Sequence, residues 1–570
     1  LSRALFPLCA LAACQQQTPG PGAPSASAWR LEARPVRTER AIVSSNSELA
    51  TAAGVEILRR GGNAVDAAVA VAFALAVAYP EAGNIGGGGF MLARFADGRT
   101  AALDFREVAP LGATRTMYAD SASRAEKRSL VGHLAVGVPG SVAGLTAALD
   151  SLGTLPLRDV MQPAIRLATE GFTVDSALAR SLTADSALIS RFAGASVFLP
   201  GGVPVREGQR LLQPELARTL ERIAERGPKG FYEGETADLL VAEMRRGGGL
   251  ITHEDLARYR PVWRRPLEGT YRGYALLGMP PSSSGGITLI ETLNILETRS
   301  RVPPFGSVAW THLVAEAFRR AFIDRNTRLG DPAFVRVPVD TLTSKAYARE
   351  LAESIANDRA TPSPSRPTAG REGNETTHFS VVDQHGNAVA LTTTINELYG
   401  SGAFVHGAGF FLNDEMDDFT ARPGEPNTFG LVQGEANAIE PGKRMLSAMT
   451  PTIVLDREGE LLLVLGSRGG PRIITSVAQT ILNVLDHGMN LGDAVAAPRI
   501  HHQAWPDSLR YEPNGLAGAV VDSLRAMGHA IGVAPWGKEG FSGRIHAVMR
   551  VPGGYVGVVD PRTSGGVAGL

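Results

Sequence analysis

Hydrophobic and polar residues alternate through residues 377–383, which predicts a β-strand. Residues 387–395, rich in Thr, Val and Leu, predict a second strand that returns after a short turn. A hairpin loop of three residues favours glycine at its last position, where the backbone is left-handed, and Gly386 occupies that position. The alternation is typical of a half-buried strand, so we expect one face of this hairpin to be covered.

The register of the hairpin places Thr376 opposite Thr394, with Asn396 two residues further along the same face. Residues 360–373, directly upstream, are rich in Pro, Ser, Thr and Gly, which is typical of a flexible exposed loop. A flexible loop that leads into a strand beginning with Thr-Thr suggests a chain that is cut there. An ordinary surface loop before an ordinary hairpin is the simpler interpretation of the composition alone, because Thr is a common strand residue.

Helical periodicity predicts helices over residues 48–60 and 64–78, and the second is apolar on almost every side, so it should be buried. Residues 141–347 are mostly helical in pattern and show no repeat or separate domain. Three more hairpins are expected, over residues 90–105, 452–466 and 546–559. Several hairpins with helical segments on either side predict an α+β fold in which sheets pack face to face under helices.

The N-terminal residues predict an export signal. Arg3 precedes a short apolar run that is not long enough to span a membrane. The letters LAAC at 11–14 resemble a bacterial lipobox with Cys14 as the lipidated residue, and a plain signal peptide is the alternative. Residues 15–40 are expected to form a flexible tether. Both cysteines of the chain, Cys9 and Cys14, lie here, so the mature chain should contain no disulfide and no thiol nucleophile.

Composition and charge exclude several classes of function. The chain has 570 residues, 44% of them hydrophobic and 20% charged, which is typical of a globular protein with an ample core. Its 56 Lys and Arg against 57 Asp and Glu leave a net charge of −1, so no basic field exists to attract nucleic acid. The glycines at 86–89 lack the Gly-Lys-Ser/Thr of a phosphate-binding loop. No Gly-x-Ser-x-Gly occurs either, which disfavours a serine hydrolase of the nucleophile-elbow type.

Charged residues mark two candidate binding positions. Glu415 and Asp418 are three residues apart, so on one helical turn they would face the same way and suit an ammonium group or a metal. No HExxH spacing accompanies them, which disfavours the metal, and the adjacent pair His501 and His502 is more simply structural. Arg106 follows a predicted strand beside acidic residues, where its guanidinium could be held in place or form an ordinary surface ion pair.

Six blocks of the sequence, in order, resemble the gamma-glutamyltransferase family. They are GGNAVDAAVAVAFALAV at 61–77, AGNIGGGGFML at 82–92, LDFREVAP at 103–110, TTHFSVVD at 376–383, LNDEMDDF at 412–419 and GSRGGPRIIT at 466–475. The resemblance runs from about residue 41 to the C-terminus. It implies the four-layer αββα sandwich of N-terminal nucleophile hydrolases. It also implies self-cleavage between Glu375 and Thr376 into a large subunit, 41–375, and a small subunit, 376–570.

The same resemblance implies a role for each site residue. Thr376 would be the nucleophile, and its new α-amine the base; an α-amine has a pKa near 7.7–8.0 and needs no histidine beside it. Thr394 would orient Thr376, and the backbone N–H groups of Gly469 and Gly470 would form an oxyanion hole. Arg106 and Ser447 would bind the α-carboxylate of the substrate. Its α-amine would be bound by Asn396, Glu415 and Asp418. Without the resemblance, the sequence would equally allow Gly469 and Gly470 to form an ordinary turn after a strand.

Residues 422–436 resemble the family's lid loop, with Phe429 at the position of its usual aromatic residue. The chain departs from the family in two places. Ala448 stands where a second serine usually follows Ser447, and Arg468 and Pro471 replace the usual Pro and Ser around the glycine pair. The first departure puts one hydrogen bond to the substrate carboxylate in doubt, whereas the second leaves both glycines intact.

The resemblance implies an enzyme that hydrolyses or transfers the γ-glutamyl group of glutathione and related compounds. Water, amino acids or dipeptides would be the acceptors, and neither a cofactor nor a metal is expected. The expected location is the periplasm, with a lipid anchor in the outer membrane, or secretion. The alternatives are a related acylase acting on glutaryl cephalosporins or polyglutamate, and a non-catalytic solute-binding lipoprotein.

Overall fold

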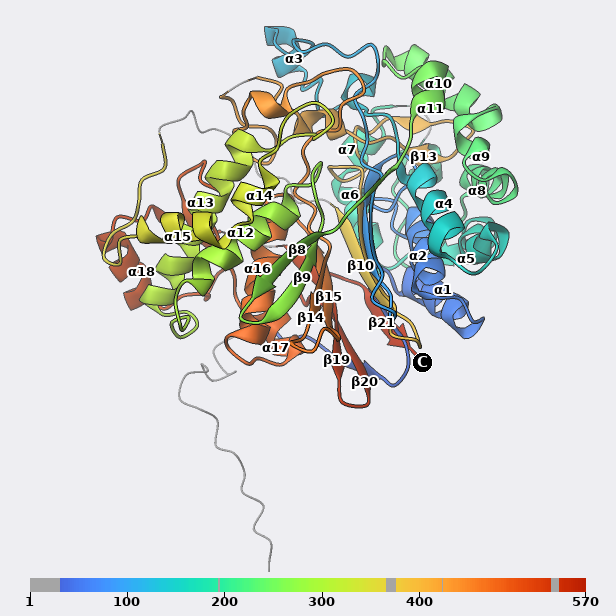
Figure 1. Cartoon of the computed structure of the whole chain (residues 1–570). Helices are drawn as coiled ribbons and strands as arrows, with labels where there is room; N and C mark the ends of the chain where they lie inside the picture. Colours follow the sequence, from blue (N-terminus) through green and yellow to red (C-terminus); the bar gives the residue numbers. More distant parts are fainter. Residues whose placement is uncertain (1–30, 193–194, 365–375, 423, 535–542) are drawn as a thin grey trace, which may run out of the picture.

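The computed structural model describes residues 31–192, 195–364, 376–422, 424–534 and 543–570. Two antiparallel sheets of seven strands each form the centre of the molecule (Figure 1). The first has the order β1 (Val36–Thr38), β20 (Gly554–Val559), β19 (Arg544–Val551), β15 (Leu461–Arg468), β14 (Thr452–Leu455), β9 (Tyr274–Gly278), β8 (Leu267–Tyr271). The second has the order β21 (Gly566–Gly569), β2 (Ile42–Ser45), β10 (Thr377–Val382), β11 (Ala388–Thr394), β3 (Gly88–Arg94), β4 (Thr100–Asp104), β7 (Val262–Arg264).

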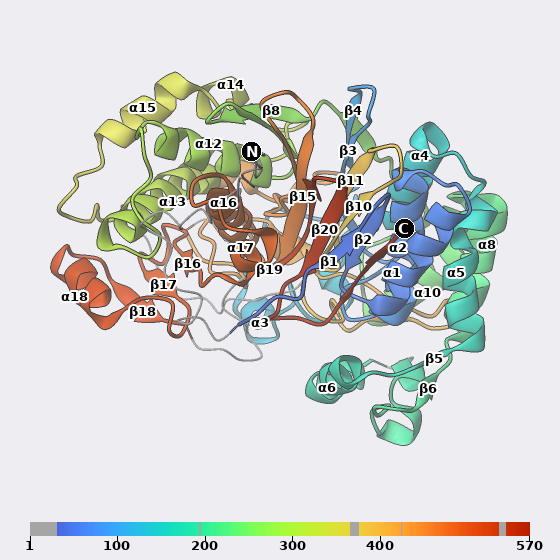
Figure 2. The ribbon, with the colours of Figure 1, turned by 90° about the horizontal axis from the view of Figure 1, so that it is seen from below.

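The two sheets pack against each other through β10 and β11 on one side and β15 on the other. Helices α1 (Glu48–Arg59) and α2 (Ala64–Ala78) cover the outer face of the second sheet, whereas α12 (Gly285–Glu297) and α16 (Arg472–Leu485) cover the first. Figure 2 shows the sheets nearly edge-on, with these helices on opposite sides. The fold is therefore a mixed α and β structure with antiparallel sheets at its centre.

The central hairpin has the predicted register. Thr377 pairs with Thr393 and Val382 with Ala388, and Gly386 has a φ of 83°. The prediction of a half-buried strand was wrong, because every residue of β10 is buried. Phe379 and Val381 pack in the core beneath α1 and α2, whereas His378, Ser380 and Val382 face the other sheet. Ser380, for example, donates to the carbonyl oxygens of Val464 and His546 at 3.3 and 3.1 Å. The alternation thus marks two kinds of buried face.

The predicted helices at 48–60 and 64–78 are confirmed as α1 and α2. Asn63 caps α2, since its side chain accepts from the backbone N–H of Asp66 while the Asp66 carboxylate accepts from the N–H of Asn63. All 15 residues of α2 are buried, as its apolar sequence predicts. The three further hairpins are confirmed as β3–β4, β14–β15 and β19–β20.

The structure adds strands to two predicted segments. Residues 141–347 are mostly helical, as predicted, but they also contain β7 and β8, which are edge strands of the two sheets, and β9, which lies between β8 and β14. Residues 36–38, part of the predicted tether, form β1 and pair with β20. Short edge strands carry few apolar positions, so their pattern is weak.

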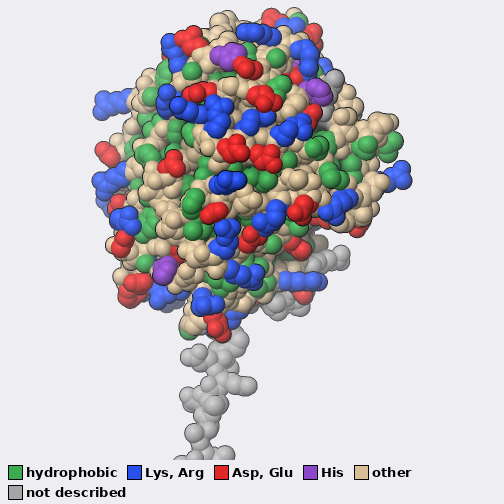
Figure 3. Space-filling view, turned by 90° about the vertical axis from the view of Figure 1, so that its right-hand side faces the viewer, with side chains coloured by type: hydrophobic (Ala, Val, Ile, Leu, Met, Phe, Trp, Pro, Cys, Tyr) green, Lys and Arg blue, Asp and Glu red, His purple; other side chains and the backbone are tan. Residues whose placement is uncertain are grey.

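The helices of the large predicted scaffold flank the sheets. Helices α4 (Ser141–Leu152) and α5 (Leu157–Glu170) contact α2, and α8 (Pro214–Arg226) packs on α5. Helix α10 (Glu235–Gly247) lies on the same side of the molecule (Figure 1). The helices beside α12 include α13 (Val308–Arg328), α14 (Val339–Leu342) and α15 (Lys345–Glu353), and α18 (Gly518–Ala526) contacts α13. On the face shown in Figure 3, positive and negative side chains are interspersed. No helix in the described part of the chain is long and apolar enough to cross a membrane.

Candidate active site

A cavity of about 20 Å³ lies where β10 begins and β11 ends. Its lining residues come from eight separate segments: Arg106, Arg325, Thr376, Thr394, Asn396, Glu415, Asp418, Phe429, Leu431, Ser447, Ala448, Met449, Gly470, Pro471 and Ile473. The fold thus brings together every predicted catalytic and binding residue except Gly469, which directly precedes Gly470.

The strand pairing of the hairpin places Thr376 opposite Thr394. Thr376 immediately precedes β10, Thr394 is the last residue of β11, and both are buried. The Thr394 hydroxyl accepts a hydrogen bond from the backbone N–H of Asn396 at 2.8 Å. The Asn396 amide in turn donates to the carbonyl oxygen of Asp414 at 3.0 Å, which fixes this side of the cavity. That Thr394 orients Thr376 stays a prediction.

The glycine pair forms the turn that connects β15 to α16, because β15 continues to Arg468. Gly469 and Gly470 have φ angles of 124° and 54°, which side chains other than glycine rarely adopt. A Cβ on Gly470 would also lie 2.6 Å from the ring of Phe429. The pair precedes the first turn of a helix of 14 residues, where the helix dipole favours negative charge. That the backbone N–H groups of this pair form an oxyanion hole stays a prediction.

Arg106 lies between two acidic side chains. Its Nη1 is 2.6 Å from Glu415 Oε2, and its Nη2 donates to Asp418 Oδ2. Glu415–Asp418 form a single 3-10 turn, so the two carboxylates face the same way as predicted. The expected ammonium between them is replaced here by the guanidinium of Arg106. A substrate must therefore share or displace this ion pair.

Burial and mutual repulsion control the charges of this cluster. Burial lowers the pKa of Arg106, but Glu415, Glu107 and Asp418 raise it further, so the guanidinium is charged. Burial raises the pKa of Glu107 to about 7, against the opposing effect of Arg106. Burial likewise raises the pKa of Asp418, although Arg106 and Arg325 both oppose the shift. Both arginines thus favour the charged form of the Asp418 carboxylate, in opposition to burial.

Ser447 and Ala448 form the opposite wall. The Ser447 hydroxyl accepts from the backbone N–H of Met449 at 3.1 Å, which leaves its proton available to a ligand. Ala448 is 9% exposed and lines the cavity, so a side chain at this position faces the site.

The predicted lid segment covers the cavity. Phe429 and Leu431 line it, and the Asn427 amide donates to Asp418 Oδ1 at 3.4 Å. The backbone N–H of Thr428 donates to Asp417 at 2.8 Å, and Gln503 donates to the Phe429 carbonyl at 3.1 Å. These bonds hold the segment closed over the cavity in this structure.

Arg325 is the lining residue that the sequence analysis missed. It lies on α13, is 1% exposed, and follows Phe318 and Phe322 at the spacing of one helical face. A charged residue on an apolar face was the available signal.

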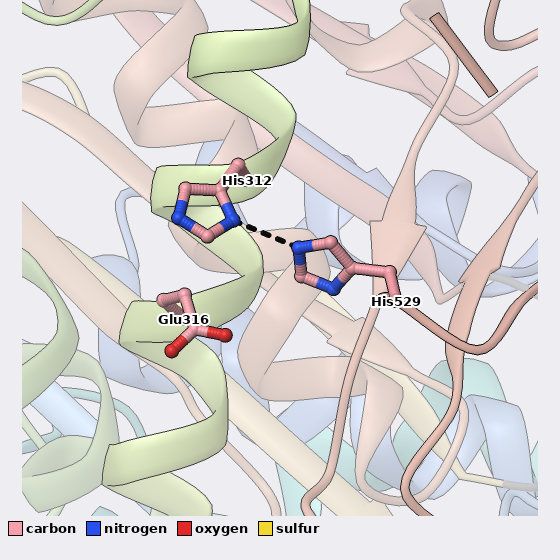
Figure 4. Close-up of side chains that lie close together, drawn as sticks. All are labelled: His312, Glu316 and His529. Carbon is pink, nitrogen blue, oxygen red and sulfur yellow. Dashed lines mark hydrogen bonds between the residues drawn. The ribbon is translucent and has the colours of Figure 1, made fainter. Parts of the chain in front are cut away.

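A second cluster, His312, Glu316 and His529, has the residue types of a metal site (Figure 4). Nδ1 of His312 and Nε2 of His529 are 2.8 Å apart and share a hydrogen bond. Glu316 is ion-paired with Arg319 and Arg320 and accepts from the backbone N–H of Thr361 at 3.1 Å. The two guanidinium groups would repel a metal cation, so this donor set fits a hydrogen-bonded cluster better than a metal centre.

Two predicted positions lie outside the described residues: Cys14, the predicted site of lipidation, and Glu375, on the upstream side of the predicted cleavage bond. His501 bonds Thr475 and Gln503 at 2.9 Å each, which fits the structural role expected of it.

Comparisons with known proteins show which family the sequence matches. The family model described as gamma-glutamyltranspeptidase matches residues 50–570. A glutathione hydrolase proenzyme from Escherichia coli is 48% identical over 537 residues, which are 93% of this chain and 91% of that protein.

Two solved structures are similar in fold. A cephalosporin acylase from Bacillus halodurans superposes with a TM-score of 0.82 at 28% identity, covering 99% of both chains. A gamma-glutamyltranspeptidase from Helicobacter pylori has a TM-score of 0.55 at 44% identity, covering 56% of this chain and 92% of that one. With the family model matched over most of its length, the chain belongs to the gamma-glutamyltranspeptidase family.

Proposed function

We propose that this protein is a self-cleaving enzyme that hydrolyses or transfers the γ-glutamyl group of glutathione and related compounds. The observation that carries the proposal is the convergence of Thr376, Gly470, Arg106 and Asp418 on one cavity. Thr376 supplies a hydroxyl at the start of a central strand, and the other residues supply an oxyanion site and a pair of opposite charges. These are the elements that acyl transfer from an amino-acid-like donor requires.

Cleavage of the bond between Glu375 and Thr376 gives Thr376 a free α-amine. The amine takes the proton of the Thr376 hydroxyl as its oxygen attacks the γ-carbonyl carbon of the donor. The oxyanion that forms is stabilised by backbone N–H groups of Gly469 and Gly470 at the start of α16. The amide C–N bond then breaks, and the proton passes to the departing amine.

An ester between the γ-carbonyl carbon and Thr376 is left, and water or an amino acid attacks it in the reverse sequence of steps. Before cleavage Thr376 has no free amine, so the uncut chain should be inactive.

The charge pattern of the cavity supports recognition of an α-amino acid head group. Arg106 and Ser447 would bind the α-carboxylate, while Asn396, Glu415 and Asp418 would bind the α-amine. Exchange is possible because the donor carries both charges: its carboxylate replaces Asp418 on Arg106, and its ammonium takes the Asp418 that is released. The one ion pair that breaks is then replaced by two, so neither Arg106 nor Asp418 loses its partner as the donor enters.

The proposed architecture is the four-layer αββα sandwich of N-terminal nucleophile hydrolases. Its support is the pair of stacked sheets, with α1 and α2 outside one and α12 and α16 outside the other. The proposed large and small subunits, residues 41–375 and 376–570, contribute strands to both sheets.

A related acylase is the second candidate, because an acylase is among the structural neighbours. An acylase that takes glutaryl groups has no donor amine to bind. Initial rates with γ-glutamyl and glutaryl anilides, each with and without a dipeptide acceptor, separate the two. We expect the γ-glutamyl donor to be preferred, with Thr376→Ala inactive on both; a preference for the glutaryl donor would overturn the assignment in favour of the acylase.

We also propose export to the periplasm with lipid on Cys14, on the strength of the LAAC motif. Expression of the full chain followed by membrane fractionation tests this: Cys14→Ala should move the enzyme to the soluble fraction. Unchanged partition would refute the anchor.

A further inference from the structure

The cavity contains two buried arginines in opposite electrostatic situations. Arg106 contacts the carboxylates of Glu415 and Asp418. Arg325 is equally buried, yet no acidic side chain in the described parts of the chain lies within ion-pair distance of it. Burial lowers the pKa of Arg325 to about 10, with Asp418 opposing the shift, so this guanidinium is still positively charged at neutral pH.

The hydrogen bonds of Arg325 join two walls of the cavity. Its Nε donates to the Ser284 hydroxyl at 3.1 Å, and Ser284 donates to the carbonyl oxygen of Ser447 at 2.6 Å. Its Nη1 donates to Gln433 at 3.1 Å, and Gln433 donates to the carbonyl oxygen of Asp418 at 3.0 Å. The guanidinium is therefore held between the segment of Ser447 and the 3-10 turn Glu415–Asp418.

The remaining nitrogen, Nη2, makes no hydrogen bond to any residue that the structure describes, although Arg325 lines the cavity. A buried guanidinium normally satisfies its donors with carboxylate or carbonyl oxygens. An unused donor on a rigidly held, uncompensated charge is what an anionic ligand would complete.

We propose that Arg325 is a second cationic binding residue of the donor site, whose Nη2 donates to the α-carboxylate of the γ-glutamyl group. The proposal rests on the function proposed above and extends it. Arg106 must exchange a carboxylate to receive the donor, whereas Arg325 offers its charge without breaking an ion pair. Arg325 would thus be the first cation to meet the incoming carboxylate, and Arg106 would follow as its acidic partners turn to the donor's ammonium.

The test compares three anilide donors with the processed wild-type enzyme, Arg325→Met and Arg325→Lys. The γ-glutamyl donor has both the carboxylate and the amine, the glutaryl donor has the carboxylate alone, and the 4-aminobutyryl donor has the amine alone. We expect Arg325→Met to raise KM about tenfold to a hundredfold for the two donors with a carboxylate. The 4-aminobutyryl donor should change less than threefold, and Arg325→Lys should recover part of the loss because it keeps the charge without the fork.

Arg328→Met is the matched control, because Arg328 lies on the same helix, is 43% exposed at its side chain and pairs with Asp324 away from the cavity. It should leave all three KM values unchanged. An equal loss for all three donors in Arg325→Met would reduce Arg325 to a structural role and overturn the proposal, as would no loss for any donor.

Should Arg325→Met fail to fold or to cleave, the inhibition constant of glutarate on Arg325→Lys provides the same comparison. It should rise at least threefold while that of 4-aminobutyrate stays constant, and a constant value for both would contradict the proposal. A wild-type enzyme that turns over the glutaryl donor but not the γ-glutamyl donor would refute the proposed function, yet would still allow the carboxylate contact to be measured.

Discussion

Restoring the hydroxyl that is missing at Ala448 should tighten donor binding. Ala448 lines the cavity beside Ser447, so Ala448→Ser would place a second hydroxyl where the substrate α-carboxylate is proposed to lie. A cavity of about 20 Å³ has room for one water, and such a water would fill the place of the missing hydroxyl in the native enzyme.

The magnitude follows from that exchange. A hydrogen bond to a charged group contributes about 1.5–3 kcal/mol, and a bridging water already supplies much of it. The net gain should therefore be about 0.5–1.5 kcal/mol, which corresponds to a KM lower by about twofold to tenfold. The turnover number should hardly change, because the charge of the α-carboxylate is the same in the ground and transition states.

Initial rates with γ-glutamyl and 4-aminobutyryl anilides measure this effect, since the second donor lacks the carboxylate. We expect Ala448→Ser to lower KM for the first donor and not for the second. An unchanged KM, or an equal improvement for both donors, would mean that residue 448 does not contact the substrate carboxylate and would refute the reasoning.

Three further predictions follow from the same cavity. Thr376→Ala should stay a single band on a denaturing gel, whereas the wild-type chain should release a fragment of about 20 kDa by its share of the 60.0 kDa chain; cleavage of the variant at the same bond would contradict self-processing. Arg106→Ala should raise KM steeply and also destabilise the fold by about 3–5 kcal/mol, because Glu415 and Asp418 lose their buried partner; a normal KM with a normal melting temperature would remove Arg106 from the site. The folded enzyme should lose stability as the pH rises from about 4.5 to about 7, because the raised pKa of Glu107 makes the folded state bind more protons than the unfolded state in that range. Glu107→Gln should flatten this slope in urea unfolding at pH 5 and pH 7, and an unchanged slope would show that other groups dominate it.

The sequence pattern predicted the hairpin well because its register depends on local rules. Loop length and Gly386 fix which residues pair, and both can be read from neighbouring letters. The pattern could not show that β10 is buried on both faces, because the polar face of a strand looks the same whether it meets water or hydroxyl and carbonyl groups of another sheet. Burial of His378 and Ser380 depends on strands far away in the sequence.

The sequence analysis predicted most residues of the candidate site but not the contacts that these residues make with one another. The resemblance implied that Arg106 binds the substrate carboxylate and Asp418 the substrate amine. In the structure the two side chains bind each other, although they are 312 residues apart in the sequence. Arg325 escaped notice since it belongs to no recognised block and its helix is mostly scaffold. The contact of α13 with Ser284, which is distant in the sequence, brings Arg325 to the cavity.

The alternation of strands from both sides of the cleavage bond has a consequence for refolding. In the second sheet, β2 from the large subunit lies between β10 and β21 from the small one, and in the first sheet β1 and β9 flank strands of the small subunit. Once the chain is cut, neither fragment retains a complete sheet, so they cannot separate without unfolding both. The precursor would refold as one molecule, whereas the mature form would need an encounter of two. The yield of mature enzyme after denaturation and refolding should therefore depend on protein concentration. The lifetime of its activity would be set by a slow unfolding rate rather than by the equilibrium free energy of unfolding.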